Sequence, residues 1–343
     1  MNPTYKVQIY LFFLISIVLV SCKDSKRVDV SKMDVKVNIM RFDKEMDALT
    51  PQNLSQKAPR LQKQYGVFYR DYMDRILGVG DTRDTAYYTD LRRVITNKDY
   101  LELKKEVLKT YQDFTPHQES LTDMFKHIKY YYPKQRIPRI VTFFSGFSVQ
   151  TPVGNDYIGI GLDMFLGANS KFYPALVQSI PQYISKRFTS ENITPRVAET
   201  FIREEMFPDR DEDRSLLAKM VYNGKILYMM DAVMPDVPDS LKIGYTAKQL
   251  QWCEDFESSI WAYFLEQDLL FETDYMKIQK FLTDAPFTPG IGDHNESAPK
   301  LGVWIGWQII RKYMDKNPET TLQQLMSETD PQKILHASRY KPK

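Results

Sequence analysis

Cysteine and histidine are both scarce in this chain of 343 residues, which has two cysteines and four histidines. Cys22 and Cys253 allow at most one internal disulfide, so the stability of the fold must come from a buried core. The chain also lacks a large excess of charge of either sign, because 46 basic residues are balanced by 44 acidic ones. Nucleic-acid binding needs a concentrated basic surface, so this balance argues against a nucleic acid as partner.

A zinc-hydrolase motif is missing as well. Catalytic zinc needs three protein ligands, and two of them commonly come from histidines four residues apart on one helix face. None of the four histidines is paired in this way; they are His117, His127, His294 and His336. We therefore expect no metal, no cofactor and no catalytic residue of this class.

The order of the segments nevertheless resembles that of gluzincin-type metallopeptidases. Two predicted strands precede the predicted helix TPRVAETFIREEMF, and a second helix, SLLAKMVYNGKILYMMD, follows. Where the first helix of a gluzincin carries its histidines, this chain offers Glu199, Glu204 and Glu205, a pattern typical of a solvated helix face. The second helix has Asn223 where an acidic ligand could lie. A degenerate gluzincin-like scaffold without the metal is thus one candidate for the fold.

A nearly unbroken apolar run, residues 7–20, lies at the N-terminus and follows Lys6. It is short for a membrane span, which needs about 20 apolar residues, and its anatomy is that of a secretory signal. It leads into Leu19-Val20-Ser21-Cys22, which resembles a bacterial lipobox. We therefore predict that Cys22 becomes the acylated first residue of the mature protein. A plain signal peptide with an incidental cysteine is the alternative.

This prediction sets the organisation of the chain. Acyl chains such as palmitate would hold the mature protein on a membrane of the cell envelope, since two or more chains anchor stably. Lys23, rather than aspartate, follows Cys22, and the choice between inner and outer membrane stays open. Cys253 is then a lone thiol. The predicted segments are a signal peptide at residues 1–21, a flexible charged tether at residues 22–36, and a single large extracytoplasmic domain at residues 37–343.

Hydrophobic periodicity predicts that this domain is mostly helical. Residues 37–130 carry apolar residues at three- and four-residue spacing, as at Leu61, Tyr65, Phe68, Tyr69, Tyr72 and Ile76. Two β-branched and aromatic runs predict neighbouring antiparallel strands at residues 139–147 and 156–162. Further helices are expected at residues 172–187, 193–206, 214–233, 246–269, 275–282, 299–314 and 320–326. The predicted fold class is α-rich α+β, predominantly helical with a small two- to three-stranded sheet near residues 139–162.

Four side chains are candidates for a ligand-facing role. Asp163 follows the second predicted strand and either caps the turn or faces a ligand. Glu257 lies beside an aromatic stripe, where a buried hydrogen-bond partner is the alternative to a functional carboxylate. Trp304 and Trp307 belong to the segment LGVWIGWQIIRKYM, in which two glycines four residues apart favour the close approach of another element. These tryptophans therefore either pack in the core or line a cleft.

Several long segments carry a resemblance to one family: YIGIGLDMFLG, MVYNGKILYMMDAVMPD, IGYTAKQLQWCEDFESSIWAYFLEQDLLF, DAPFTPGIG, LGVWIGWQIIRKYM and PQKILHASRYKPK. Together they resemble the gliding motility lipoprotein GldB family of the Bacteroidetes over essentially the whole chain, lipobox included. The resemblance implies a cell-envelope lipoprotein needed for surface gliding, with other envelope proteins of the gliding and type IX secretion machinery as partners. It implies no enzymatic activity, and the only residue role that it transfers is lipid attachment at Cys22.

Two other functions stay open at this point. One is a cell-envelope hydrolase on a gluzincin-like scaffold that lacks the usual zinc ligands. The other is a glycan- or peptide-binding protein that uses a cleft between residues 156–162 and residues 299–314.

Overall fold

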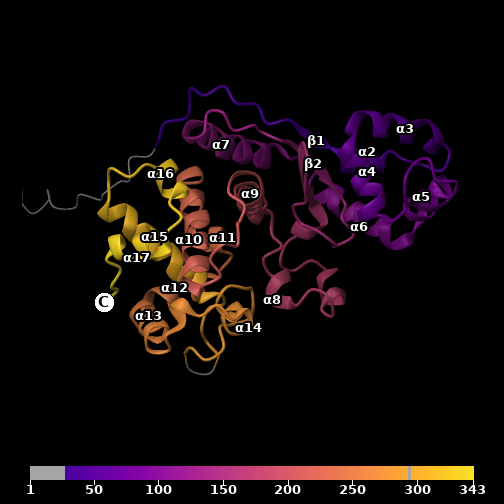
Figure 1. Cartoon of the computed structure of the whole chain (residues 1–343). Coiled ribbons are helices and arrows are strands. Elements are labelled where there is room, and N and C mark those ends of the chain that lie inside the picture. The colour runs from indigo at the N-terminus through magenta and orange to yellow at the C-terminus, as the bar shows by residue number, and fades with distance from the viewer. Residues whose placement is uncertain (1–27, 293–294) are drawn as a thin grey trace, which may run out of the picture. The chain divides into compact units, whose positions relative to one another are not determined.

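A computed structural model of the chain describes residues 28–292 and 295–343. The predicted signal peptide and the predicted lipid attachment site Cys22 lie outside the described residues. Residues Met33–Lys343 form one compact unit, and the fold described below is the fold of that unit (Figure 1).

Helices dominate this unit, and a small sheet lies among them (Figure 1). The strands are β1 (Ile39–Arg41), β2 (Arg139–Phe143), β3 (Val153–Gly154) and β4 (Tyr157–Gly161). The α-helices are α2 (Phe42–Asp47), α3 (Leu54–Tyr65), α4 (Val67–Asp71), α5 (Tyr87–Thr96), α6 (Lys98–Thr110), α7 (Thr115–Tyr131), α8 (Gln182–Ser185), α9 (Ile193–Thr200), α10 (Leu216–Val233), α11 (Asp239–Ile243), α12 (Ala247–Asp255), α13 (Glu257–Glu266), α14 (Tyr275–Ile278), α15 (Leu301–Lys316), α16 (Leu322–Ser327) and α17 (Pro331–Ser338). Two π-helical turns, η1 (Tyr72–Ile76) and η5 (Phe201–Met206), extend α4 and α9, and short 3₁₀ turns are η2 (Leu162–Phe165), η3 (Tyr173–Leu176), η4 (Ser190–Asn192), η6 (Leu269–Phe271) and η7 (Gln279–Phe281). The predicted α-rich α+β class is confirmed.

The sheet has four strands in the order β1-β2-β4-β3, one more than the two or three predicted. β2 and β4 are parallel, so the antiparallel pairing predicted for them is wrong. The turn-forming residues that precede β4 instead belong to a hairpin of β3 and β4. β3 runs antiparallel to β4, with Val153 opposite Ile158 and Gly154 opposite Tyr157. Because this tight hairpin reverses the chain once more, β4 returns in the direction of β2. Both strands are largely buried, as is typical of parallel strands.

An aromatic cluster fills the core between the sheet and the N-terminal helices. Phe42 of α2 is fully buried, and its ring lies 4.7 Å from that of Tyr65, 5.1 Å from that of Phe68 and 5.0 Å from that of Tyr72. Phe68 in turn contacts Phe143 of β2 at 5.6 Å, in the edge-to-face geometry that aromatic pairs prefer. The apolar residues predicted at helical spacing between Leu61 and Ile76 therefore face the core. The helix that carries them is divided into α3 and α4 at Gly66, whose φ is +57°.

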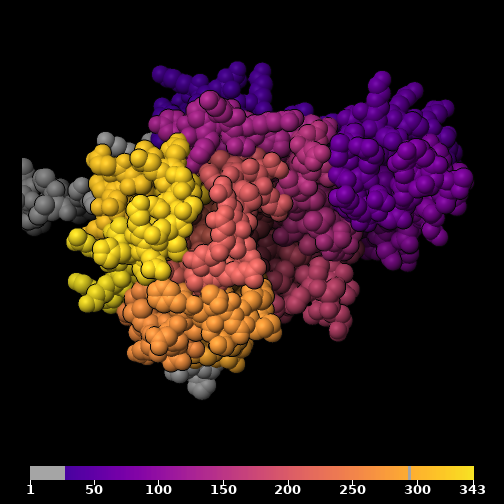
Figure 2. Space-filling view, in the orientation of Figure 1, coloured from indigo at the N-terminus to yellow at the C-terminus, as the bar shows by residue number. Residues whose placement is uncertain are grey.

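Helices α10 and α15 cross at very short range, and glycines make this possible. A β-carbon on Gly306 would lie 1.9 Å from the carbonyl oxygen of Met220, and one on Gly224 would lie 2.3 Å from the carbonyl oxygen of Gly306. The two backbones are thus in direct contact, which no residue with a side chain would allow. In the space-filling view of Figure 2, α10 is framed by the C-terminal residues, in yellow, and by the α12–α14 segment, in orange.

Two of the predicted helices are each divided into two shorter elements. The predicted helix 172–187 is divided into η3, which has Pro174 in its first turn, and α8, which Pro181 directly precedes; proline removes a backbone donor. The predicted helix 246–269 is divided at Phe256 into α12 and α13. Ser215 begins α10, and Thr246 with Gln249 forms a capping box that begins α12.

Candidate functional site

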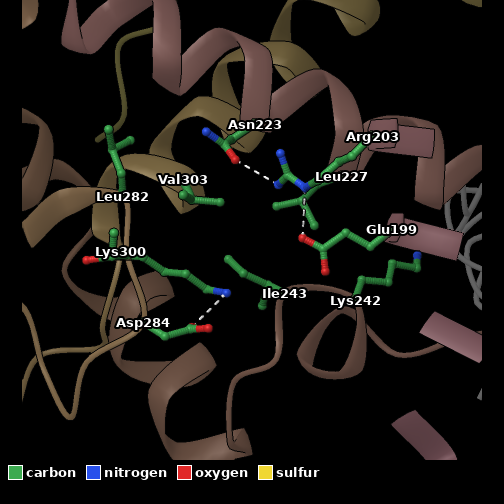
Figure 3. Close-up of a pocket in the computed structure, with 11 residues that line it drawn as sticks. Glu199, Arg203, Asn223, Leu227, Lys242, Ile243, Leu282, Asp284, Lys300 and Val303 are labelled. Atoms are coloured by element: carbon green, nitrogen blue, oxygen red, sulfur yellow. Dashed lines mark hydrogen bonds and ion pairs between the residues drawn. The ribbon is translucent and has the colours of Figure 1, made fainter. Parts of the chain in front are cut away.

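A polar cavity of about 310 Å³ lies between α9, α10, α11 and the start of α15 (Figure 3). Three apolar side chains, Leu227, Ile243 and Val303, are almost fully buried in its wall, and most of the other lining side chains are charged or polar. The lining residues are Glu199, Arg203, Asn223, Leu227, Lys242, Ile243, Leu282, Thr283, Asp284, Lys300 and Val303.

Glu199 and Arg203 form one charged wall of the cavity. They are four residues apart where α9 passes into η5, so both project from the same face of the helix. Arg203 Nε donates to Glu199 Oε1 at 3.1 Å, and Arg203 Nη2 donates to Asn223 Oδ1 of α10 at 2.7 Å. The second oxygen of Glu199 pairs with Arg196, one turn earlier on α9. Glu199 is therefore shared between two guanidinium groups.

The electrostatic surroundings keep Glu199 ionised. Burial favours the neutral carboxyl group and raises its pKa, but the positive charges of Arg196, Arg203 and Lys300 outweigh burial and lower the pKa of Glu199 to about 2. The contribution of Lys300, which belongs to the opposite wall, indicates that charges act on each other across the cavity.

Asp284 and Lys300 form the opposite charged wall. Lys300 Nζ lies 3.1 Å from Asp284 Oδ1, and Arg187 donates to both oxygens of Asp284, at 3.1 and 2.8 Å. Burial raises the pKa of Asp284, but Lys300 and Arg187 hold it well below the usual range. Burial lowers the pKa of Lys300, and the nearby Asp284 only partly offsets this. Asp284 is thus also shared between two cations.

The backbone at Lys300 is unusual. Its φ of 44° lies in the left-handed region, which side chains other than those of glycine and asparagine rarely adopt. Lys300 precedes α15 and its carbonyl oxygen accepts from the N–H of Val303 at 2.9 Å. Only 9% of the residue is exposed. This conformation holds a buried lysine at the N-terminus of α15. Strained backbone positions of this kind concentrate at functional sites.

Lys242 also lines the cavity, but its charge is compensated elsewhere. Its Nζ lies 2.8 Å from Asp231 Oδ1 and 3.5 Å from Asp239 Oδ1. Arg311 pairs with the same two carboxylates, so this cluster has two positive and two negative charges. Arg311 stacks over the ring of Trp307 at 3.8 Å, and Trp307 Nε1 donates to Asp231 at 2.9 Å. The cluster fixes α10, α11 and α15 against one another beside the cavity.

Asp163, a predicted site residue, is fully buried in a different part of the fold. It accepts from the backbone N–H of Ser145 at 2.6 Å, from the Ser145 hydroxyl at 2.8 Å and from the N–H of Phe147 at 2.6 Å. Burial raises its pKa, and these hydrogen bonds lower it in part. Gly146 and Phe147 both have positive φ, so the carboxylate holds the tight turn that follows β2.

The other three predicted site residues do not line the cavity either. Glu257 accepts a hydrogen bond from the hydroxyl of Tyr340 at 2.6 Å, which ties α13 to the C-terminus. Trp304 and Trp307 are both buried in α15. Trp307 donates to Asp231, which pairs with the lining residue Lys242, whereas Trp304 Nε1 has no hydrogen-bond partner among the described residues. The structure therefore does not bring the four predicted side chains together.

Sequence reasoning missed most of the cavity. Glu199 was considered together with Glu204 and Glu205, which are exposed as expected, but only Glu199 is enclosed by cations. The spacing of Arg196, Glu199 and Arg203 at three and four residues was a visible signal for such an arrangement. Nothing comparable could place the second wall, because Asp284 and Lys300 are not at a helical spacing in the sequence.

The described residues offer no ready site for a metal ion. Within residues 28–292 and 295–343, no group of three or more histidine, cysteine, aspartate or glutamate side chains is arranged to hold one. His294 and its neighbour Asp293 lie outside this range. In the same described part of the chain, none of the helices combines the length and the apolar character that a bilayer span requires.

Comparison with known proteins gives one match. The family model described as gliding motility protein GldB matches residues 23–342, which is nearly the whole chain. No curated protein and no solved structure matches. The gluzincin-like scaffold accordingly stays a prediction.

Proposed function

The chain belongs to the family of the gliding motility protein GldB, and on that premise we propose that it is a non-catalytic lipoprotein of the gliding apparatus, anchored through Cys22 and associated with the type IX secretion machinery. The family match carries this proposal. It supports a role in gliding motility and a place in the cell envelope. The matched region begins at Lys23, so the anchor at Cys22 rests on the lipobox-like sequence Leu19-Val20-Ser21-Cys22.

The chemistry of the cavity supports the non-catalytic part of the proposal. General acid catalysis needs a carboxyl group that is protonated near neutral pH. Both carboxylates of the cavity, Glu199 and Asp284, have a lowered pKa and are ionised there. The eleven lining residues include no histidine and no cysteine. A hydrolase that uses either carboxylate as its general acid is therefore the weaker candidate, and turnover of envelope peptides or glycans by the purified protein would favour it.

The anchor is tested by replacing Cys22. We expect Cys22→Ala to remove incorporation of an alkyne-labelled palmitate, to shift the protein from the membrane to the soluble fraction, and to abolish gliding, because the acyl chains supply the membrane affinity. Cys253→Ala is the matched control, since it removes the only other cysteine and leaves the anchor in place. A Cys22→Ala protein that stays membrane-bound and supports normal gliding would contradict the proposal.

The association with the secretion machinery needs a separate experiment. Crosslinking in intact cells, followed by purification of the anchored protein from envelope fractions, should recover envelope proteins of that machinery. The same procedure with Cys22→Ala should recover them poorly. Recovery of the anchored protein without any envelope partner would count against this part of the proposal, while the anchoring result would stand independently.

A further inference from the structure

The two charged walls of the cavity have the same construction. On one wall Glu199 is shared between Arg196 and Arg203, and on the other Asp284 is shared between Arg187 and Lys300. In each case one cation, Arg196 or Arg187, is not part of the lining, and the other borders the cavity. Each wall thus has two positive charges for one negative charge.

The cations that border the cavity keep donors for a ligand. The guanidinium of Arg203 has five N–H donors; it gives one each to Glu199 and Asn223 and also interacts with Tyr222. The ammonium of Lys300 has three donors, and its one ion pair within residues 28–292 and 295–343 is with Asp284. Figure 3 shows both side chains extending from opposite walls toward the same space. Two incompletely compensated cations in a largely buried setting favour a negatively charged ligand, since unpaired buried charge is costly.

The remaining surface and the size of the cavity restrict the ligand further. Leu227, Ile243 and Val303 lie next to the cations and offer a narrow apolar surface, since each is almost fully buried. The volume of about 310 Å³ lies at the lower end of the range found for small-molecule sites. A bare inorganic anion would leave the apolar wall unused. A large glycan would not fit.

From this geometry we infer that the cavity binds an organic carboxylate with an apolar body, about the size of one amino acid residue. The carboxylate lies between Arg203 and Lys300, and the apolar body lies against Leu227, Ile243 and Val303. Arg203 is suited to this role because its planar guanidinium matches the two oxygens of a carboxylate. The inference goes beyond the lipoprotein role and does not depend on it.

The test compares two probes that differ in one charge. The mature protein, purified in detergent, is titrated with N-acetyl-leucine and with N-acetyl-leucinamide, and binding is measured by calorimetry and by the thermal unfolding midpoint. We expect N-acetyl-leucine to bind and to raise the midpoint, and the amide to bind at least about tenfold more weakly, because it lacks the charge that Arg203 and Lys300 recognise. Equal binding of both probes, or binding of neither, overturns the inference.

Variants then locate the site. Lys300→Gln should lower the affinity for N-acetyl-leucine by about tenfold or more. Arg203→Lys keeps the charge but loses the planar guanidinium, and it should also lower this affinity. Lys171→Gln, which removes an exposed lysine paired with Glu102, is the matched control and should bind normally.

Inorganic phosphate is the third probe. Binding of phosphate without binding of N-acetyl-leucine would assign the cavity to another anion and overturn the carboxylate assignment. The comparison of the two probes on the unaltered protein can overturn the inference by itself, so the test stands even if a variant fails to fold.

Discussion

Glu199 shows how one residue can hold a charged cavity together. Its carboxylate receives Arg196 and Arg203 from its own helix, and through Arg203 it is connected to Asn223 of α10. Only 21% of the side chain is exposed. Without this carboxylate, two guanidinium groups would face each other in a poorly hydrated space. A buried ion pair adds little stability compared with apolar residues of similar size. Removing only one partner, however, lowers the free energy of unfolding strongly, because the other charge stays buried without compensation.

We therefore expect Glu199→Gln to lower the free energy of unfolding at pH 7 by about 2–3 kcal/mol. The pKa of Glu199 is lowered to about 2 in the folded protein, from 4.5 in the unfolded chain. Its stabilisation is therefore complete above about pH 5 and is lost as the pH falls from there toward 2. Urea unfolding of both proteins at pH 7 and at pH 3 should show a difference that shrinks at the lower pH.

Glu204→Gln is the control for this measurement. Glu204 belongs to the same helical segment but is exposed, so its replacement should change stability by less than about 0.5 kcal/mol at either pH. A Glu199→Gln protein as stable as the Glu204→Gln protein at pH 7 would show that the two arginines do not depend on Glu199.

At the scale of the secondary-structure element, the crossing of α10 and α15 positions both the cavity and the buried ion cluster beside it. α10 supplies Asn223 and Leu227, Lys300 directly precedes α15, and Val303 lies in its first turn. Their separation is set by Gly224 and Gly306, which let the backbones touch. A change in this separation would therefore move the two walls of the cavity apart as well as weaken the core.

Gly306→Ala tests this crossing. Alanine favours a helix over glycine by about 1 kcal/mol, yet its methyl group would lie 1.9 Å from a backbone oxygen that cannot move without the whole helix. We expect a net loss of about 2 kcal/mol in the free energy of unfolding, measured by denaturant titration. Gln308→Ala, at a partly exposed position of α15, should be nearly neutral. A Gly306→Ala protein more stable than the unaltered one would mean that the helices are not in backbone contact.

The same elements show what the sequence could and could not predict. The long apolar-rich segments that became α7, α10 and α15 were predicted, and the two glycines of α15 correctly indicated a close approach. The direction of β4 was not, because it depends on the two-residue strand β3, which is too short to produce a pattern of its own. β1 was missed for the same reason, since three residues leave no periodicity.

The cavity was predicted even less well than the sheet, for a physical reason. Local spacing can place Arg196, Glu199 and Arg203 on one helix face, but the opposite wall comes from Arg187, Asp284 and Lys300, which are far apart in the chain. Their meeting is set by tertiary packing. By contrast, Asp163 and Glu257 stood out in the sequence because they lie next to apolar runs, and the structure places them as buried or partly buried hydrogen-bond partners.

At the scale of the whole molecule, the distribution of charge bears on how the protein is held at a membrane. Removal of residues 1–21 takes away only Lys6 among the 46 basic residues, which leaves 45 basic residues against 44 acidic ones. A polybasic segment contributes about 1 kcal/mol per lysine or arginine near an anionic bilayer, whereas a balanced chain gains little. The predicted acyl chains of Cys22 contribute about 0.8 kcal/mol for every buried methylene group instead.

Membrane attachment should therefore resist salt and yield to detergent. Salt at about 1 M shortens the screening length to about 3 Å and removes electrostatic attachment, but it does not weaken the burial of acyl chains. We expect envelope membranes washed in this way to retain the protein, and a mild detergent to release it. Cys22→Ala membranes, treated in parallel, should hold little protein before the wash. Release of the unaltered protein by salt alone would mean that a charged surface of the folded unit, rather than Cys22, holds it at the membrane.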